Sequence, residues 1–212
     1  VKTLSRPLRV KQVHLEDGLE AIACDGAPSD CVALALLGLV EEEIDLVVSG
    51  INPFANLGSD VTYSGTVTAA MEAVIFGKPG VAFSFDGLSG PANADLSDAA
   101  QISRQITEKV LERGLPKGVL LNVNIPYLPA EQIKGFQITR QGKRVYRDAL
   151  DARIDPLGKP YYWIGGEAPT GLPDEGTDFG ALARGYVSIN PLHLDMTAHD
   201  QIQQLGEWGW ER

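Results

Sequence analysis

The sequence predicts an α/β fold, in which a mostly parallel sheet is flanked by helices on both faces. Short apolar, β-branched runs such as residues 44–48, 80–85 and 119–125 are typical of buried parallel strands. The segments between these runs carry apolar residues at helical spacing, and they end at Gly or Pro. This alternation of strands and helices is the pattern that builds a parallel sheet covered on both sides.

The N-terminal residues and the core elements follow in a clear order. Extended segments on either side of residues 16–18, Glu-Asp-Gly, predict a hairpin. The elements expected after it are a helix capped by Ser29 or Asp30 and ending at Leu39, a strand over 44–48, a polar loop over 51–63, a helix over 64–76, a strand over 80–85, a helix over 93–112 and a strand over 119–125.

The pattern changes after Pro126. Residues 135–165 predict strands linked by turns, followed by a loop over 166–180, a strand over 185–189 and a polar terminal helix over 198–208. A long hairpin is difficult to bury within one small domain, which favours a role as an oligomerisation arm. We therefore expect a single domain with an α/β core over 1–134 and a hairpin and C-terminal extension over 135–212.

Composition excludes several classes of protein. The 212 residues are 44% hydrophobic and carry a formal net charge of −10, which disfavours binding to a nucleic-acid polymer. No apolar run is long enough to span a membrane, and no signal peptide begins the sequence. Cys24 and Cys31 lack metal-site spacing, so we interpret them as reduced core residues of a cytoplasmic protein.

The loop over 51–63 and the helix that follows it carry the most chemical information. Open α/β sheets bind ligands at the carboxyl ends of their strands, where this loop begins. Ser64, Gly65 and Thr66 open the helix with hydroxyls, unpaired N–H groups and the positive end of the helix dipole. These groups suit a phosphate. The alternative is an ordinary strand–turn–helix connection with Ser64 or Thr66 as N-cap. The segment lacks the Walker A, dinucleotide-binding and nucleophile-elbow patterns.

Several ordered blocks in this region resemble a known family. Ser-Gly-Ile-Asn stands at 49–52, Asn-Leu-Gly at 56–58 and Tyr-Ser-Gly-Thr-Val at 63–67. Further matching blocks are found at 25–31, 122–126, 139–142, 176–179, 185–188 and 191–199. Together these blocks resemble the SurE (survival protein E) family of nucleotidases and acid phosphatases.

The resemblance implies a metal-dependent phosphomonoesterase that hydrolyses nucleoside 5′- and 3′-monophosphates and, in some members, short polyphosphate. It implies a Rossmann-like fold with a protruding β-hairpin arm and a C-terminal helix, assembled as a homodimer or homotetramer through the swapped arm. The metal would be Mg²⁺ or Mn²⁺, which prefer oxygen ligands. By motif, Asn52 is a metal ligand, and Asn56, Ser64, Gly65 and Thr66 are the catalytic and substrate-binding group around the phosphate.

The sequence departs from the family pattern in its carboxylates. The family holds its metal with an adjacent pair of aspartates in an N-terminal motif and with a serine after the second strand. No Asp-Asp pair occurs in this chain, and Thr3 to Arg9 resembles the segment that follows the serine. We therefore expect the chain to lack the first one or two β-α units and to be weakly active or inactive by itself. Phe54 is a second departure, at a position that is often glycine.

Other polar residues have two interpretations. His199 lies four residues after Asp195, which favours a proton donor to the leaving group, while the alternative is a polar cap on the last helix. We interpret Asp60 and Asp86 as turn residues, or as groups that support the metal ligands without binding the metal, and not as metal ligands. The alternative function is a non-catalytic phosphate-binding or oligomeric structural module. A serine hydrolase built on Ser64 and His199 is less favoured, because no third member of a triad is evident.

Overall fold

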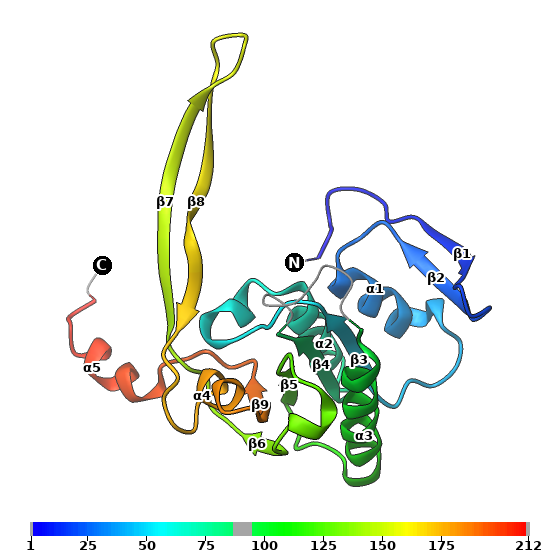
Figure 1. Cartoon of the computed structure of the whole chain (residues 1–212). Coiled ribbons are helices and arrows are strands. Elements are labelled where there is room, and N and C mark those ends of the chain that lie inside the picture. The colour runs from blue at the N-terminus through cyan, green and yellow to red at the C-terminus, as the bar shows by residue number, and fades with distance from the viewer. Residues whose placement is uncertain (1, 87–94, 211–212) are drawn as a thin grey trace.

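The computed structural model describes residues 2–86 and 95–210, and a mixed five-stranded sheet forms its centre (Figure 1). The strand order is β3-β4-β5-β9-β6. The first three strands are parallel, β9 is antiparallel to β5, and β6 is parallel to β9. The strands span Val47–Asn52 (β3), Gly80–Phe85 (β4), Val119–Ile125 (β5), Phe136–Ile138 (β6) and Val187–His193 (β9). The predicted α/β fold class is confirmed.

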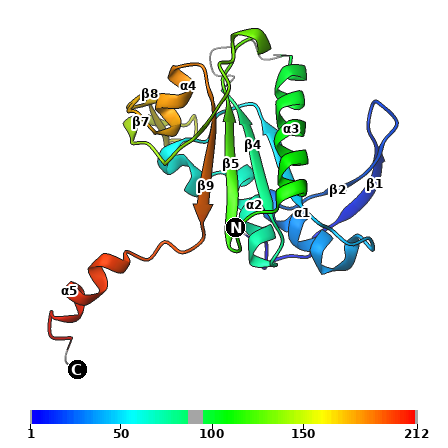
Figure 2. The ribbon, with the colours of Figure 1, turned by 90° about the horizontal axis from the view of Figure 1, so that it is seen from below.

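Two long helices cover opposite faces of the sheet, as the view in Figure 2 shows: α2, Gly65–Ile75, and α3, Ser97–Arg113. Alternate residues of β4 supply both interfaces. Val81, Phe83 and Phe85 pack in the cluster formed with α3. Ala82 packs in the cluster formed with α2. Because both faces are buried, the strand is apolar along almost its whole length, which is the signal that predicted it.

The boundaries of the core elements agree with the sequence in most places. β4 and β5 occupy the residues predicted for them, and α2 differs from its predicted range by one residue at each end. β3 begins at Val47, not at residue 44, because its pairing with β4 starts with Val47 opposite Gly80. The helix predicted over 93–112 is α3, whose described part begins at Ser97; residues 93 and 94 lie outside the described residues.

The N-terminal region contains the predicted hairpin, formed by β1, Val10–His14, and β2, Glu20–Cys24. The first helix, α1, spans Pro28–Leu34 and continues as a wider turn over Ala35–Leu39. Its N-cap is Ala27, so the prediction of a cap at Ser29 or Asp30 is wrong. Asp30 lies in the first turn instead, and its carboxylate accepts a hydrogen bond from the Ala27 amide (2.8 Å).

The second half of the chain forms a long hairpin and a C-terminal arm. Strands β7, Arg144–Ile154, and β8, Pro160–Gly171, pair with each other and project from the core (Figure 1). β8 therefore extends into the segment predicted as a loop. The other short helices among the described residues are η2 (Gly58–Thr62), η4 (Ala130–Gln132), α4 (Asp178–Ala183), η5 (His199–Gln201) and α5 (Ile202–Gly206). In the described part of the chain, no helix has the length and apolarity needed to cross a membrane.

Candidate active site

The end of β3 is shaped by Gly50. Its φ is 123°, and a Cβ built on it would lie 2.3 Å from the carbonyl oxygen of Phe83 on the neighbouring strand. Only glycine fits there. After this close contact between Gly50 and Phe83, β3 ends at Asn52, which lies opposite Ser84 on β4. The Asn52 Nδ2 atom donates to the carbonyl oxygen of Phe54 (2.6 Å), so the Asn52 Oδ1 atom remains available to a ligand.

Asn56 is held from three sides at the carboxyl edge of the sheet. Its backbone N–H donates to Asn124 Oδ1 (2.8 Å), and its Nδ2 donates to Ser84 Oγ (2.6 Å). Its carbonyl oxygen accepts from Asn122 Nδ2 (2.9 Å) and Asn124 Nδ2 (3.1 Å). Asn122, Asn124 and Ser84 are fully buried within otherwise apolar strands. No role was predicted for them, although Asn122 and Asn124 lie in the matching block 122–126 and polar residues in a buried strand are themselves a signal.

The N-terminus of α2 lies at the same edge, since the helix follows β3. Ser64 is the N-cap, and its Oγ accepts from the Val67 amide (3.1 Å). The structure therefore confirms the capping role given to Ser64 as an alternative, but the hydroxyl proton can still be donated to a ligand. Among the described residues, the amides of Gly65 and Thr66 have no hydrogen-bond partner. Two unpaired amides and the helix dipole make this end suitable for an anion.

The loop between Asn56 and α2 is fastened by a residue from the far end of the chain. Asp178 is fully buried, and its carboxylate accepts hydrogen bonds from the amides of Gly58 (2.7 Å), Gly142 (2.8 Å) and Phe179 (2.9 Å). Gly58 has a φ of 53°, and a Cβ there would lie 2.6 Å from the Gly142 carbonyl oxygen. The loop and the segment leading to the hairpin are thus in direct backbone contact.

A second set of contacts joins the same loop to the root of the hairpin. Arg144 forms an ion pair with Asp60 (2.8 Å) and lies over the ring of Phe179 (5.6 Å to its centroid). Tyr146 donates a hydrogen bond from its hydroxyl to Asp60 (2.7 Å), which raises the pKa of Tyr146 to about 12. Asp60 therefore binds the hairpin in this structure.

Asp86 follows the last residue of β4 on the same edge of the sheet. Its backbone amide donates to the carbonyl oxygen of Ile125 (2.8 Å), which extends the pairing with β5. Burial raises the pKa of its carboxyl group, and the positive charge of Arg144 opposes part of that rise. The side chain is half-buried and does not belong to a cluster of metal ligands among the described residues.

His199 is not brought to α2 within one chain. Its Nε2 atom lies 2.7 Å from Asp195 Oδ2, and both side chains are exposed. The segment that carries them leads away from the core in both views (Figures 1 and 2). The sequence-predicted residues that the structure gathers at one edge of the sheet are Asn52, Asn56, Ser64, Gly65 and Thr66.

The donor set does not complete a divalent-cation site. Over residues 2–86 and 95–210, no three His, Cys, Asp or Glu side chains come together in a way that would hold a metal. Asn52 Oδ1 is a neutral oxygen, whereas Mg²⁺ and related hard cations are normally held with the help of carboxylates. The residues described here therefore do not fit a bound Mg²⁺ or Mn²⁺ without further ligands.

Comparison with known proteins adds information of a different kind. Residues 1–148 match the family described as "Survival protein SurE". The chain is 53% identical over 210 residues to the "5'-nucleotidase SurE" of Herpetosiphon aurantiacus, covering 99% of this chain and 82% of that protein. It is 48% identical over 212 residues to the protein of the same name from Chloroflexus aggregans, covering 99% and 83%.

A solved structure is similar over nearly the whole chain. The crystal structure of the SurE protein from Aquifex aeolicus superposes with a TM-score of 0.76 at 42% sequence identity. The similarity covers 96% of this chain and 80% of that one. With 42% of the aligned residues identical, the two proteins are similar in sequence as well as in fold.

Proposed function

The chain belongs to the SurE family, and from this premise we propose that it is a phosphomonoesterase that removes phosphate from nucleoside 5′-monophosphates. The relatives named 5'-nucleotidase are 48% and 53% identical over nearly the whole chain. The structural observation that carries the proposal is the pair of unpaired amides at Gly65 and Thr66, which open α2 beside Asn56 at the carboxyl edge of the sheet. This arrangement matches the needs of a phosphoryl group.

The residues of α2 would act on the charge of the phosphate. The amides of Gly65 and Thr66 and the hydroxyls of Ser64 and Thr66 donate to the non-bridging oxygens. These donors are fixed by the helix, so they need no rearrangement as charge shifts during phosphoryl transfer. Asn56 is anchored through its backbone and its Nδ2 atom, which directs its Oδ1 atom with little freedom. We propose that it orients the substrate or the attacking water.

Metal dependence, with Mg²⁺ or Mn²⁺, is a separate part of the proposal. The Asn52 carboxamide is the candidate ligand in this chain, and carboxylates from outside the described cluster are needed to hold the ion. A bound divalent cation would supply positive charge at the phosphate and a water of lowered pKa. Without it, the residues described here bind and orient a phosphate, which is the alternative function of a non-catalytic phosphate-binding module.

The same site extends the proposal to other phosphate esters. Nucleoside 3′-monophosphates and short polyphosphate present the same terminal phosphoryl group to α2, so the amide donors do not discriminate against them.

We propose a homodimer or homotetramer, built through the hairpin and the C-terminal arm. Exposed aromatic and aliphatic side chains on these two segments support this assembly, and they include Trp163, Ile164, Met196, Trp208 and Trp210.

The test compares phosphate release from AMP by this chain and by the H. aurantiacus relative, each with Mn²⁺, with Mg²⁺ and with EDTA. We expect slow, metal-dependent release by the chain and much faster release by the relative. Equal and strong rates would show that activity does not depend on carboxylates beyond those in this chain. Absence of release together with tight orthophosphate binding would favour the non-catalytic module.

Ser64→Ala tests the phosphate-binding role of α2 directly. Removing one fixed donor to a developing anion typically slows catalysis by about 10²–10³-fold, and loss of the cap costs about 1 kcal/mol of stability. Ser103→Ala on α3 is the matched control, because both serines are 8% exposed and Ser103 lies in a different helix. Orthophosphate binding, followed by ³¹P NMR, should weaken in Ser64→Ala and remain unchanged in Ser103→Ala.

A further inference from the structure

The two cysteines of the chain, Cys24 and Cys31, lie on consecutive elements. Cys24 is the last residue of β2, and Cys31 lies near the start of α1. Cys24 is half-buried and Cys31 is exposed, so the prediction that both are core residues is wrong for Cys31. The buried residues of α1 are Ser29, Asp30 and Ala33, and Cys31 lies on the opposite side of this helix.

A tight turn brings the end of β2 onto the start of α1. The Sγ atom of Cys24 accepts a hydrogen bond from the Gly26 amide (3.3 Å), so the Cys24 side chain faces this turn. Gly26 packs against α1, because a Cβ built on it would lie 2.7 Å from Asp30 Cβ. The Cys31 amide donates to the carbonyl oxygen of Ala27 (3.2 Å). The turn and the helix are therefore in direct contact next to Cys31.

The thiols of Cys24 and Cys31 contact each other through a side-chain hydrogen bond. Burial, followed by the neighbouring Cys24 thiol, raises the pKa of the Cys31 thiol. A disulfide requires two cysteines whose Cβ atoms are about 4 Å apart and whose side chains point toward each other. Two thiols that already share a hydrogen bond are arranged for that bond.

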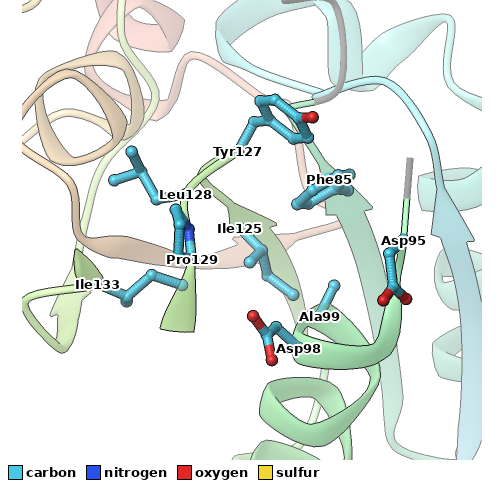
Figure 3. Close-up of a pocket in the computed structure, with 9 residues that line it drawn as sticks. All are labelled: Phe85, Asp95, Asp98, Ala99, Ile125, Tyr127, Leu128, Pro129 and Ile133. Carbon is cyan, nitrogen blue, oxygen red and sulfur yellow. The ribbon is translucent and has the colours of Figure 1, made fainter. Parts of the chain in front are cut away.

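A reagent in solution reaches Cys31 directly. Cys31 is exposed on α1, whereas Cys24 is half-buried. The pocket of about 390 Å³ at the N-terminus of α3, whose nine lining residues are drawn in Figure 3, includes neither cysteine. Reaction at the thiols therefore does not require a ligand bound in that pocket. Exposure sets the order of reaction instead, with Cys31 first and Cys24 second.

We propose that Cys24 and Cys31 form a redox-sensitive site, which a low-molecular-weight disulfide such as oxidised glutathione converts into an intramolecular disulfide. The Cys31 thiolate attacks one sulfur of the oxidant and releases one thiol, which leaves a mixed disulfide on Cys31. The Cys24 thiolate then attacks Cys31 Sγ and releases the second thiol. The two cysteines lose two electrons and two protons, and the oxidant gains them as two thiols. This chemistry is independent of the phosphatase activity proposed above.

The disulfide would clamp a segment that lies beside the candidate phosphate site. Residues 25–27 lead from Cys24 to Pro28, the first residue of α1. Pro28 packs against the start of α2, because a Cβ built on Gly65 would lie 3.2 Å from Pro28 Cγ. A bond between Cys24 and Cys31 closes a short loop around Pro28 and restricts its movement. Oxidation is therefore expected to rigidify the segment that contacts Gly65.

Mass spectrometry of the whole chain after treatment with oxidised glutathione tests the site. The wild type should lose two hydrogen atoms, retain no glutathione and regain its mass in dithiothreitol. Cys24→Ser should stop with one glutathione on Cys31, because the second thiol is absent. Cys31→Ser should react at least about tenfold more slowly, because the remaining thiol is half-buried. Wild-type chains that stay reduced, carry two glutathiones or form linked dimers would overturn the proposal.

A matched control moves one thiol along the same strand. Ile22 lies on the same side of β2 as Cys24, two residues and about 7 Å earlier, and it is 38% exposed. The double variant Cys24→Ser, Ile22→Cys therefore separates the two thiols, and it should carry two glutathiones while folded. In concentrated urea, the wild type and the control lose their native geometry and should behave alike. Equally fast disulfide formation in the folded control would overturn the proposal, because contact between the thiols would then be unnecessary.

Amide hydrogen exchange tests whether the disulfide clamps α1. The Cys31 amide, which donates to the Ala27 carbonyl oxygen, should exchange at least about tenfold more slowly in the oxidised wild type than in the reduced protein. The Val110 amide in α3 provides the internal control, and its exchange should not change. Equal exchange of the Cys31 amide in the two redox states would overturn the clamp.

Discussion

The loop that follows β3 and the hairpin β7–β8 both lie outside the central sheet, but they are stabilised in opposite ways. The loop has no regular secondary structure between Asn52 and Gly58, yet its backbone groups are bound by buried side chains of β5 and α4. The two strands of the hairpin are paired along their length, with one irregularity between Val145 and Arg147, yet most of its described side chains are exposed. Regular structure and burial are therefore separate properties here.

The difference shows which of the two regions finds its supporting contacts within one chain. The loop contacts residues 68 and 120 positions away in the sequence, so it forms only when the whole core has folded. The hairpin contacts itself and, through Arg144 and Tyr146, the loop at Asp60. The candidate site has its supporting contacts in place, while the hairpin presents apolar surface that another protein chain can cover.

The largest effect is expected where the loop depends on one side chain. Asp178→Ala removes the acceptor of three amides, of which those of Gly58 and Phe179 are buried, and each unsatisfied buried group costs about 1–3 kcal/mol. We expect the free energy of unfolding to fall by several kcal/mol and orthophosphate binding to weaken strongly, measured by urea denaturation and ³¹P NMR. Asp178→Asn keeps one oxygen acceptor and should lose less of both.

Glu72→Gln provides the matched control for Asp178. Glu72 is an acidic residue of α2, and it is also buried. It forms an ion pair with Lys2 (2.6 Å) and does not contact the loop. We expect its replacement to lower stability with little effect on phosphate binding per folded molecule. If Asp178→Ala binds orthophosphate as tightly as Glu72→Gln does, the loop is not organised by Asp178 and the contrast with the hairpin disappears.

The same contrast explains what the sequence could predict. β4 and β5 were predicted at their observed residues, because burial on both faces makes most of their side chains apolar. The short helix α4 was missed, since six residues are too few to show a helical period. Asn56 and Ser64 were identified by motif, but the partners that anchor Asn56 and the loop lie in distant segments. Sequence spacing carries local information, and these anchors are not local.

A moderate effect is expected on the hairpin. Trp163 and Ile164 of β8 are 62% and 85% exposed, so replacing both with serine removes apolar surface without opening a cavity. We expect the protein to shift toward monomers in analytical ultracentrifugation, with a change in unfolding free energy within about 0.5 kcal/mol for the isolated chain. Ile75→Ser, also at an exposed position but on α2, should leave the sedimentation unchanged. Unaltered self-association of the double variant would show that the hairpin is not an interface.

The smallest effect is expected in the C-terminal arm, which is exposed like the hairpin and, unlike the loop, has only local polar contacts at Asp195. Hydrogen bonds from Thr197, followed by the contact with His199, lower the pKa of Asp195 to about 2 from an ordinary value of 3.8. Because the pKa is lowered, these contacts stabilise the arm above about pH 4, and the stabilisation is lost as the pH falls toward 2. Thr197→Ala should therefore raise the pKa of Asp195 more than His199→Ala does, as followed by ¹³C NMR of the carboxyl group. An equal or larger shift in His199→Ala would show that the histidine, and not the Thr197 turn, determines the charge of Asp195, and the arm would then be organised by an ion pair.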